Sequence, residues 1–215
     1  MHILSHRGMW CEPCQKNTHK SFLKSFLSGF GTETDFRDYN GELVVSHDVP
    51  LCRPELTGHD FFAIDETIGR KLPLAINVKS DGLQKILKEI IIVNKLTNYF
   101  VFDMSIPDAV QFVKADIPIF TRQSDFEPEP YLYSDAVGVW IDAFKDDSWI
   151  TAEIVSRHLH AKKRVCIVSP ELHGREPSRL WERLCLNSFV ENPNFMICTD
   201  LPLHACKFFN YDQKS

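Results

Sequence analysis

Short apolar runs that suit β-strands alternate with helix-like runs along the whole chain, and this alternation limits the fold more than any other feature. Strands that are joined by helical returns build a parallel sheet, because each return has to lead back to the end where the next strand begins. Eight strand positions are predicted, at residues 2–7, 32–36 with a continuation at 43–46, 74–78, 99–104, 118–121, 136–141, 164–168 and 195–198.

Helices are predicted between most of these strands, at residues 17–30, from 81, from 105, at 151–161, at 177–186 and after Pro202. Asp38-Tyr39-Asn40-Gly41 is a turn signal, so residues 32–46 should form a β-hairpin or a bent strand. The Pro- and Glu-rich segment 126–133 is predicted to be a loop with a short helix.

Eight strands with mainly helical returns fit a closed α/β barrel, the (β/α)8 or TIM barrel. A doubly wound open sheet would show the same alternation, so strand counting leaves that alternative open. The chain has 215 residues, 44% hydrophobic and 25% charged, which suits one compact globular domain over residues 1–215.

The charge pattern argues against a nucleic-acid partner. The net charge is −5, and no run of Lys or Arg supplies the basic face that a phosphate backbone attracts. No apolar run reaches membrane-spanning length, and strand-like sequence begins almost at Met1, where a secretory signal would show a charged and then an apolar region. We therefore expect a cytoplasmic protein without stable membrane insertion.

Seven cysteines are present, and most are expected to be free thiols. Cys166 and Cys198 lie in apolar runs that read as buried strands. Cys11 and Cys14 form a CxxC pair that could hold zinc or act as a redox couple, but no second pair follows at a zinc-finger spacing.

Polar residues lie in or just after several predicted strands, toward the carboxyl ends of those strands. Glu33 and Asp35 alternate on one side of the second strand, and Asn77 and Lys79 on one side of the third. Two carboxylates buried side by side repel each other unless a cation neutralises them. Hard oxygen ligands suit Mg²⁺ or Ca²⁺ rather than zinc, so the pattern predicts a divalent metal at the barrel mouth.

Two histidines end strands beside other polar residues, His6 after the first strand and His47 after the hairpin. Imidazole titrates near neutral pH, so one ring could accept a proton while the other donates one. Six further histidines are interpreted as ordinary core or surface groups: His2, His19, His59, His158, His160 and His204. His173 follows the seventh strand and is a candidate for substrate contact.

The order of these residues resembles the glycerophosphodiester phosphodiesterase family and its superfamily, which includes phosphatidylinositol-specific phospholipases C and sphingomyelinases D. The matching segments are His6-Arg7-Gly8, Asn17-Thr18 with Ser21-Phe22, Glu33-x-Asp35, His47-Asp48, Asn77-x-Lys79 and Thr199-Asp200-x-Pro202. Matches are dense over residues 6–79, return at 199–202 and are loose between them. His-Arg-Gly alone is a weak signal, whereas the ordered set is specific.

This resemblance implies a phosphodiester hydrolase of lipid metabolism, acting on a small glycerophosphodiester-like molecule. It makes His6 and His47 the general acid and base, assigns the metal to Glu33, Asp35 and Asn77, and lets Arg7 and Lys79 hold the phosphate. The metal would be Mg²⁺, with Ca²⁺ as the alternative. Other strand ends add four candidate substrate contacts: Asp103, Trp140, Asp142 and Glu171.

The sequence departs from the family pattern in two places. Asn77 stands where the family carries a carboxylate, which should weaken metal binding. Only a short stretch, residues 49–71, joins His47 to the third strand, so we expect little or no inserted cap domain.

Three alternatives remain. The enzyme could stop at a cyclic phosphate as a lyase, or the barrel could only bind phosphorylated ligands. A Schiff-base enzyme using Lys79 fits less well, because that lysine follows the polar Asn77 rather than apolar residues.

Overall fold

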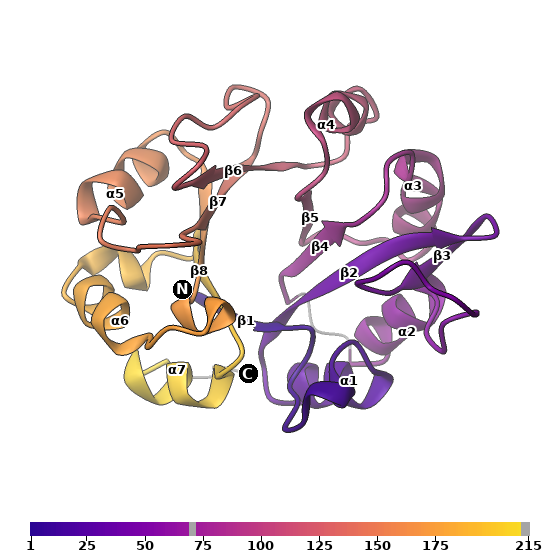
Figure 1. Cartoon of the computed structure of the whole chain (residues 1–215), viewed down its shortest axis with the longest axis horizontal. Coiled ribbons are helices and arrows are strands. Elements are labelled where there is room, and N and C mark those ends of the chain that lie inside the picture. Colours follow the sequence, from indigo (N-terminus) through magenta and orange to yellow (C-terminus); the bar gives the residue numbers. More distant parts are fainter. Residues whose placement is uncertain (69–71, 212–215) are drawn as a thin grey trace.

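The computed structural model describes residues 1–68 and 72–211, without the side chains of residues 65–68. In the described part of the chain, eight parallel strands form a nearly closed ring, with helices on its outside (Figure 1). The strands of the ring are β1 (His2–His6), β2 (Gly31–Tyr39), β4 (Leu74–Val78), β5 (Tyr99–Phe102), β6 (Phe120–Ser124), β7 (Gly138–Asp142), β8 (Arg164–Val168) and β9 (Phe195–Thr199).

Closure of the ring decides between the two folds that the sequence left open. The hydrogen-bonded order is β5-β4-β2-β1-β9-β8-β7-β6, and its two ends meet at a parallel bridge between Val101 and Ile119. The amide of Val101 also donates to the carbonyl of Pro118 at 2.9 Å. A doubly wound sheet has two open edges, so this contact confirms the predicted (β/α)8 barrel.

The predicted hairpin is also confirmed. Strand β3 (Glu42–Val45) runs antiparallel to the outer half of β2 and stands off the ring. Asn40 and Gly41 have φ angles of +50° and +82°, which are the left-handed values that a two-residue hairpin turn needs. The hairpin carries the chain back beside the carboxyl end of β2.

The outer layer consists of α1 (His19–Leu27), α2 (Gly58–Ile68), α3 (Gln84–Val93), α4 (Ile106–Lys114), α5 (Ala152–His160), α6 (Ser178–Cys185) and α7 (Pro202–Phe208), with three 3-10 turns, η1 (Pro13–Gln15), η2 (Pro170–His173) and η3 (Ser188–Glu191). The connection at residues 49–71 holds α2 and, in its described part, no inserted cap; residues 69–71 lie outside the described part.

Two sequence expectations around β6 are wrong. The short helix predicted within residues 126–133 is absent from this described segment, which forms bends and a turn instead. Pro128 and Pro130 have no amide hydrogen to donate, which disfavours a helix there. Strand β6 also extends to Ser124 rather than ending at Thr121, because Arg122 and Ser124 pair with Trp140 and Asp142 of β7.

The barrel interior is filled by side chains that alternate along the strands. The rings of Phe100 and Phe120 stack with centroids 3.6 Å apart, and those of Phe102 and Trp140 stack at 3.9 Å. Cys166 and Cys198 are buried in the same layer, as predicted. Cys11 and Cys14 are exposed free thiols.

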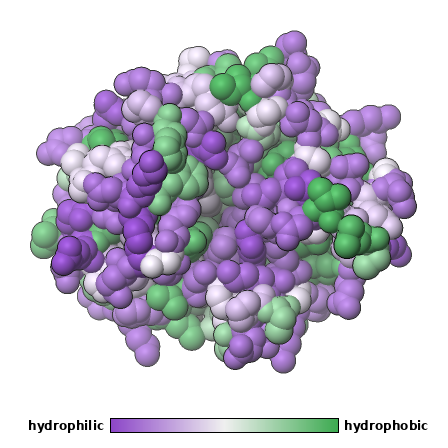
Figure 2. Space-filling view, viewed as in Figure 1, coloured by the Kyte–Doolittle hydropathy of each residue, from purple (hydrophilic) through white to green (hydrophobic). Residues whose placement is uncertain are grey.

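One face of the molecule is mainly hydrophilic. Figure 2 shows hydrophilic residues over most of the face seen in Figure 1, with apolar residues in small separate patches. Among the helices of the described residues, none is both long and apolar enough to cross a bilayer.

Candidate active site

Strand register brings the predicted site residues together at the carboxyl ends of β1, β2 and β4. His6 lies opposite Glu33 in the β1–β2 pair, and Asp35 lies opposite Asn77 in the β2–β4 pair. These strands are consecutive around the ring and parallel, so their carboxyl ends open at one mouth. Four residues that are up to 71 positions apart in the sequence therefore form one cluster.

Arg7 and Lys79 converge on Asp35 from the two neighbouring strands. The Nε atom of Arg7 lies 2.9 Å from Oδ2 of Asp35, and Nζ of Lys79 lies 3.5 Å from Oδ1. The side-chain amide of Asn17 also donates to Oδ2, at 2.8 Å. Asp35 is fully buried, so these cations offset the cost of removing its charge from water.

Packing against α1 requires a glycine at position 8, the last residue of His6-Arg7-Gly8. Gly8 has a φ angle of +83°, and a Cβ atom there would come within 2.5 Å of Oγ and 2.8 Å of the backbone carbon of Ser21 in α1. Only glycine fits this turn without moving the helix. The turn places Arg7 at the mouth, with a left-handed φ of its own.

The ionisation of Glu33 is strongly affected by its surroundings. Its side chain is 1% exposed, and Oε1 accepts a hydrogen bond from Nδ2 of Asn77 at 3.2 Å. Burial, together with the neighbouring charge of Asp35, raises the pKa of Glu33 to about 7. The negative charges of Glu33 and Asp35 therefore still repel each other, even with Arg7 and Lys79 nearby.

The oxygens of Glu33, Asp35 and Asn77 could hold a divalent cation. Oδ1 of Asn77 and Oδ1 of Asp35 are buried without a hydrogen-bond partner, which is costly unless another group contacts them. Two carboxylates and an amide oxygen suit Mg²⁺ or Ca²⁺. Among the side chains that the structure describes, no three of His, Cys, Asp and Glu cluster as metal ligands.

His6 is held by a residue to which the sequence analysis assigned no role. Its Nδ1 atom lies 2.7 Å from Oδ1 of Asp200, which follows β9. A carboxylate accepts hydrogen bonds, so Nδ1 carries a proton, and in the neutral ring Nε2 keeps its lone pair. Nε2 lies 3.9 Å from Oε2 of Glu33, facing the cluster. The signal in the sequence was Thr199-Asp200, which matched the family motif but carried no assignment.

His47 reaches the same end of the barrel on an exposed loop. The amide of Ser46 donates to the carbonyl of Asp35 at 3.0 Å, so the hairpin delivers His47 beside the carboxyl end of β2. The His47 side chain is 44% exposed, and its Nδ1 atom pairs with Oδ1 of Asp48 at 2.9 Å. His47 is therefore much less enclosed than His6.

Two of the other predicted substrate contacts, Asp103 and Asp142, pair with basic side chains. Asp103 bridges Lys79 at 3.4 Å and Arg122 at 2.5 Å, and Asp142 pairs with Nε2 of His173 at 2.6 Å. Asp103 follows β5 and Asp142 ends β7, so both carboxylates lie at the mouth.

The other two candidates are engaged within the protein itself. Trp140 is 4% exposed and stacked on Phe102 inside the barrel, so the structure gives it a core role. Both carboxylate oxygens of Glu171 already accept hydrogen bonds from Ser169, Thr199 and the amide of Asp200. These bonds leave Glu171 little capacity to bind substrate.

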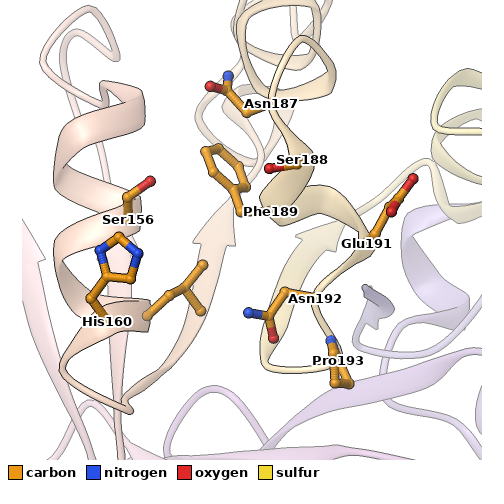
Figure 3. Close-up of a pocket in the computed structure, with 9 residues that line it drawn as sticks. Ser156, His160, Asn187, Ser188, Phe189, Glu191, Asn192 and Pro193 are labelled. Carbon is orange, nitrogen blue, oxygen red and sulfur yellow. The ribbon is translucent and has the colours of Figure 1, made fainter.

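A separate hollow of about 500 Å³ lies between α5 and the segment around η3. Figure 3 shows Ser156 and His160 of α5 on one side, and Asn187, Ser188 and Asn192 on the other. Asn192 and His160 precede β9 and β8, so this hollow is at the amino ends of the strands. Residues at that end of a (β/α)8 barrel serve stability rather than catalysis.

No protein-family model matches the chain, and no curated protein matches its sequence. Solved structures do match. A glycerophosphodiester phosphodiesterase from Parabacteroides distasonis ATCC 8503 has a TM-score of 0.70 at 13% identity, over 97% of this chain and 96% of that one. The enzyme of that name from Agrobacterium tumefaciens str. C58 has a TM-score of 0.67 at 15% identity, over 96% and 99%.

A third match is a phosphodiesterase from Oleispira antarctica, solved with its product sn-glycerol-3-phosphate. It has a TM-score of 0.66 at 14% identity, over 98% of this chain and 97% of that one. This chain has the fold of the glycerophosphodiester phosphodiesterases.

The similarity covers nearly the whole chain, so the glycerophosphodiester phosphodiesterase fold agrees with the prediction of one barrel domain. At these identities the similarity establishes the fold, and one fold can carry many chemistries. The chemistry has to be argued from the cluster at the mouth.

Proposed function

We propose that the chain is a metal-dependent phosphodiesterase that acts on a small glycerophosphodiester-like molecule. The main support is the register that assembles His6, Glu33, Asp35 and Asn77 at the mouth of a barrel shared with glycerophosphodiester phosphodiesterases. Arg7 and Lys79 add positive charge beside this cluster. An anionic phosphodiester would be attracted to a site that combines such cations with proton-transfer groups.

Glu33, Asp35 and Asn77 would hold the metal, Mg²⁺ or alternatively Ca²⁺. Bound there, the cation would polarise a nonbridging phosphate oxygen and offset charge that grows on the phosphoryl group. Oδ1 of Asp35 and Oδ1 of Asn77, which are buried and accept no hydrogen bond, support this assignment, as does the raised pKa of Glu33.

His6 and His47 would move the protons. One ring takes the proton from the attacking water or substrate hydroxyl as the new P–O bond forms. The other ring gives a proton to the leaving alcohol as the old P–O bond breaks. The Asp200 contact supports His6 in this role, because it places the proton of the neutral ring on Nδ1 and leaves Nε2 directed toward Glu33. Arg7 and Lys79 would bind phosphate oxygens through their charged N–H groups.

A binding barrel is the second candidate, and one observation favours it. Nδ2 of Asn77 donates to Glu33, and two cations already pair with Asp35, so the cluster is partly neutralised by its own residues. Such a site could bind a phosphoryl group with little turnover. A lyase that releases a cyclic phosphate would use the same residues.

The purified chain should be assayed with bis(p-nitrophenyl) phosphate and with glycerophosphodiesters in the presence of Mg²⁺, Ca²⁺ or EDTA. We expect turnover that EDTA abolishes and Mg²⁺ restores. Phosphorus NMR of the products separates a hydrolase from a lyase, because a cyclic phosphate has its own resonance. Turnover that is indifferent to EDTA would contradict the metal assignment. Saturable binding of glycerol phosphate without turnover would establish the binding barrel.

Asn77→Glu is expected to tighten Mg²⁺ binding by about tenfold, because it adds a charged oxygen ligand beside Glu33 and Asp35. Titration calorimetry of the metal into wild type and variant measures this difference directly. Asn94→Glu is a matched control, since Asn94 lies at the other end of the barrel, after α3. Equal affinities of Asn77→Glu and wild type would show that residue 77 does not ligate the metal.

A further inference from the structure

Glu171 lies in the 3-10 turn η2, directly after β8, and its carboxylate reaches across to the end of β9. Oε2 accepts a hydrogen bond from the hydroxyl of Ser169. Oε1 accepts one from the hydroxyl of Thr199 and one from the backbone amide of Asp200, at 3.1 Å. Three donors from two neighbouring strand ends therefore meet on a single carboxylate.

The groups that donate to the hydroxyls of Ser169 and Thr199 determine the direction of these hydrogen bonds. Nε1 of Trp181 donates to Oγ of Ser169 at 2.8 Å, and an indole can only donate. The amide of Leu201 donates to Oγ1 of Thr199 at 2.9 Å, and an amide N–H likewise only donates. Each hydroxyl thus accepts one hydrogen bond and has its own proton free to donate to Glu171. Ser169, Thr199 and Trp181 are fully buried, so water does not compete for these bonds.

Asp200 links Glu171 to His6. The amide of Asp200 bonds to Glu171, and the carboxylate of Asp200 bonds to Nδ1 of His6 at 2.7 Å. The second Asp200 oxygen lies 3.5 Å from Nζ of Lys16. A shift of the Asp200 backbone would move its carboxylate away from the His6 ring, because only the short Asp side chain separates them.

We propose that Glu171 is a positioning residue that fixes Asp200 and, through it, the orientation and tautomer of His6. The inference rests on the proposed function for its catalytic consequence, but the structural link itself does not. Supporting groups of this kind, one contact behind the acting residue, typically change activity by about 10- to 100-fold when they are altered. Glu171 would act without touching the substrate.

The neighbours of Glu171 in the same segment are engaged elsewhere. His173 pairs with Asp142, and Arg175 pairs with Asp147 at 3.1 Å. Glu176 is exposed and bonds to Ser178 at the start of α6. Glu176 therefore provides a matched control, an acidic residue five positions away without a link to His6.

The test compares Glu171→Gln with wild type and with Glu176→Gln. Glutamine keeps the shape of the side chain but turns an amide NH₂ toward donors that need an acceptor. We expect kcat on a glycerophosphodiester to fall about 10- to 100-fold with KM within about twofold. Long-range ¹H–¹⁵N NMR should show a smaller fraction of the Nδ1-protonated tautomer of His6. Glu176→Gln should match wild type in both measurements.

A double-variant cycle separates this role from general damage. If Glu171 acts through Asp200, adding Glu171→Gln to Asp200→Asn should change kcat by less than about twofold. Thr199→Val removes one of the three donors and serves if Glu171→Gln does not fold; it should shift the His6 tautomer in the same direction by less.

The NMR measurement keeps the two proposals apart. Unchanged His6 signals in Glu171→Gln, or in Thr199→Val if only that variant folds, would overturn the positioning role, whatever happens to kcat. A changed tautomer in a protein that cleaves no phosphodiester would confirm the positioning role and refute the proposed function.

Discussion

His6→Ala is expected to lower kcat on a glycerophosphodiester by about 10³-fold while the fold is retained. Removing a general acid or base typically costs 10²- to 10⁴-fold, and His6 is the more enclosed of the two proposed proton-transfer groups. The variant loses one hydrogen bond to Asp200, worth about 1 kcal/mol, so the thermal midpoint should change little. His47→Ala should show a loss of similar size.

The leaving group distinguishes the roles of the two histidines. A p-nitrophenolate leaves without much help from an acid, whereas a glycerol alkoxide needs a proton. The variant that lacks the general acid should therefore regain much of its activity on bis(p-nitrophenyl) phosphate, and the variant that lacks the base should not. His160→Ala is the control, because this exposed residue lies at the opposite end of the barrel. Near-normal activity of both His6→Ala and His47→Ala would refute the acid–base assignment.

The second large effect concerns stability against acid and arises at His158. This residue of α5 is 2% exposed, and its ring lies between two polar partners. Nδ1 contacts the hydroxyl of Tyr133 at 2.9 Å, and Nε2 contacts Oε1 of Gln123, also at 2.9 Å. A Gln carbonyl oxygen only accepts, so Nε2 carries the single proton and Nδ1 accepts from Tyr133. Both ring nitrogens are satisfied by the neutral form.

Burial, with a smaller contribution from the charge of Arg157, lowers the pKa of His158 from 6.5 to about 4. The unfolded chain then binds more protons than the folded one between pH 4 and pH 6.5. Stability from this group is fully present above pH 6.5 and is lost as the pH falls toward 4. The difference in pKa corresponds to at most about 3 kcal/mol over that range.

Urea denaturation of wild type and His158→Gln between pH 4 and pH 7.5 measures this effect. The free energy of unfolding of the variant should fall less steeply below pH 6.5, because glutamine does not titrate. Carboxylates elsewhere affect both proteins equally, so the difference between the two curves isolates His158. Parallel curves would mean that His158 titrates alike in the folded and unfolded chain.

Much of the fold could be predicted from local patterns. The eight strands appear close to their predicted positions, and Arg164–Val168 and Leu74–Val78 match them residue for residue. Apolar strands of this kind are recognisable because a barrel strand is covered by helices outside and by side chains inside. Strand β6 was misplaced because Arg122 and Gln123 are polar, and only pairing with β7 keeps them in the sheet.

Some residues of the candidate site could likewise be predicted from local sequence, and others could not. His6 and Asn77 stand at or next to the ends of their strands, and Glu33 and Asp35 alternate along β2, so local sequence already shows their positions. The sequence did not predict the roles of Asp200 and Glu171, because those roles depend on distant contacts. Asp200 contacts His6, which is 194 positions away, and Glu171 contacts Asp200, which is 29 positions away. The metal, the roles of His6 and His47 and the cytoplasmic location stay predictions.

The sequence by itself determined the alternation of strands and helices, the hairpin and the polar residues at the strand ends, because these depend on neighbours within a few residues. Only the tertiary structure decided that the sheet closes between β5 and β6, that Trp140 is buried, and that Glu171 holds Asp200 beside His6. Those outcomes depend on which distant strands become neighbours, and strand register, rather than any local pattern, sets that proximity.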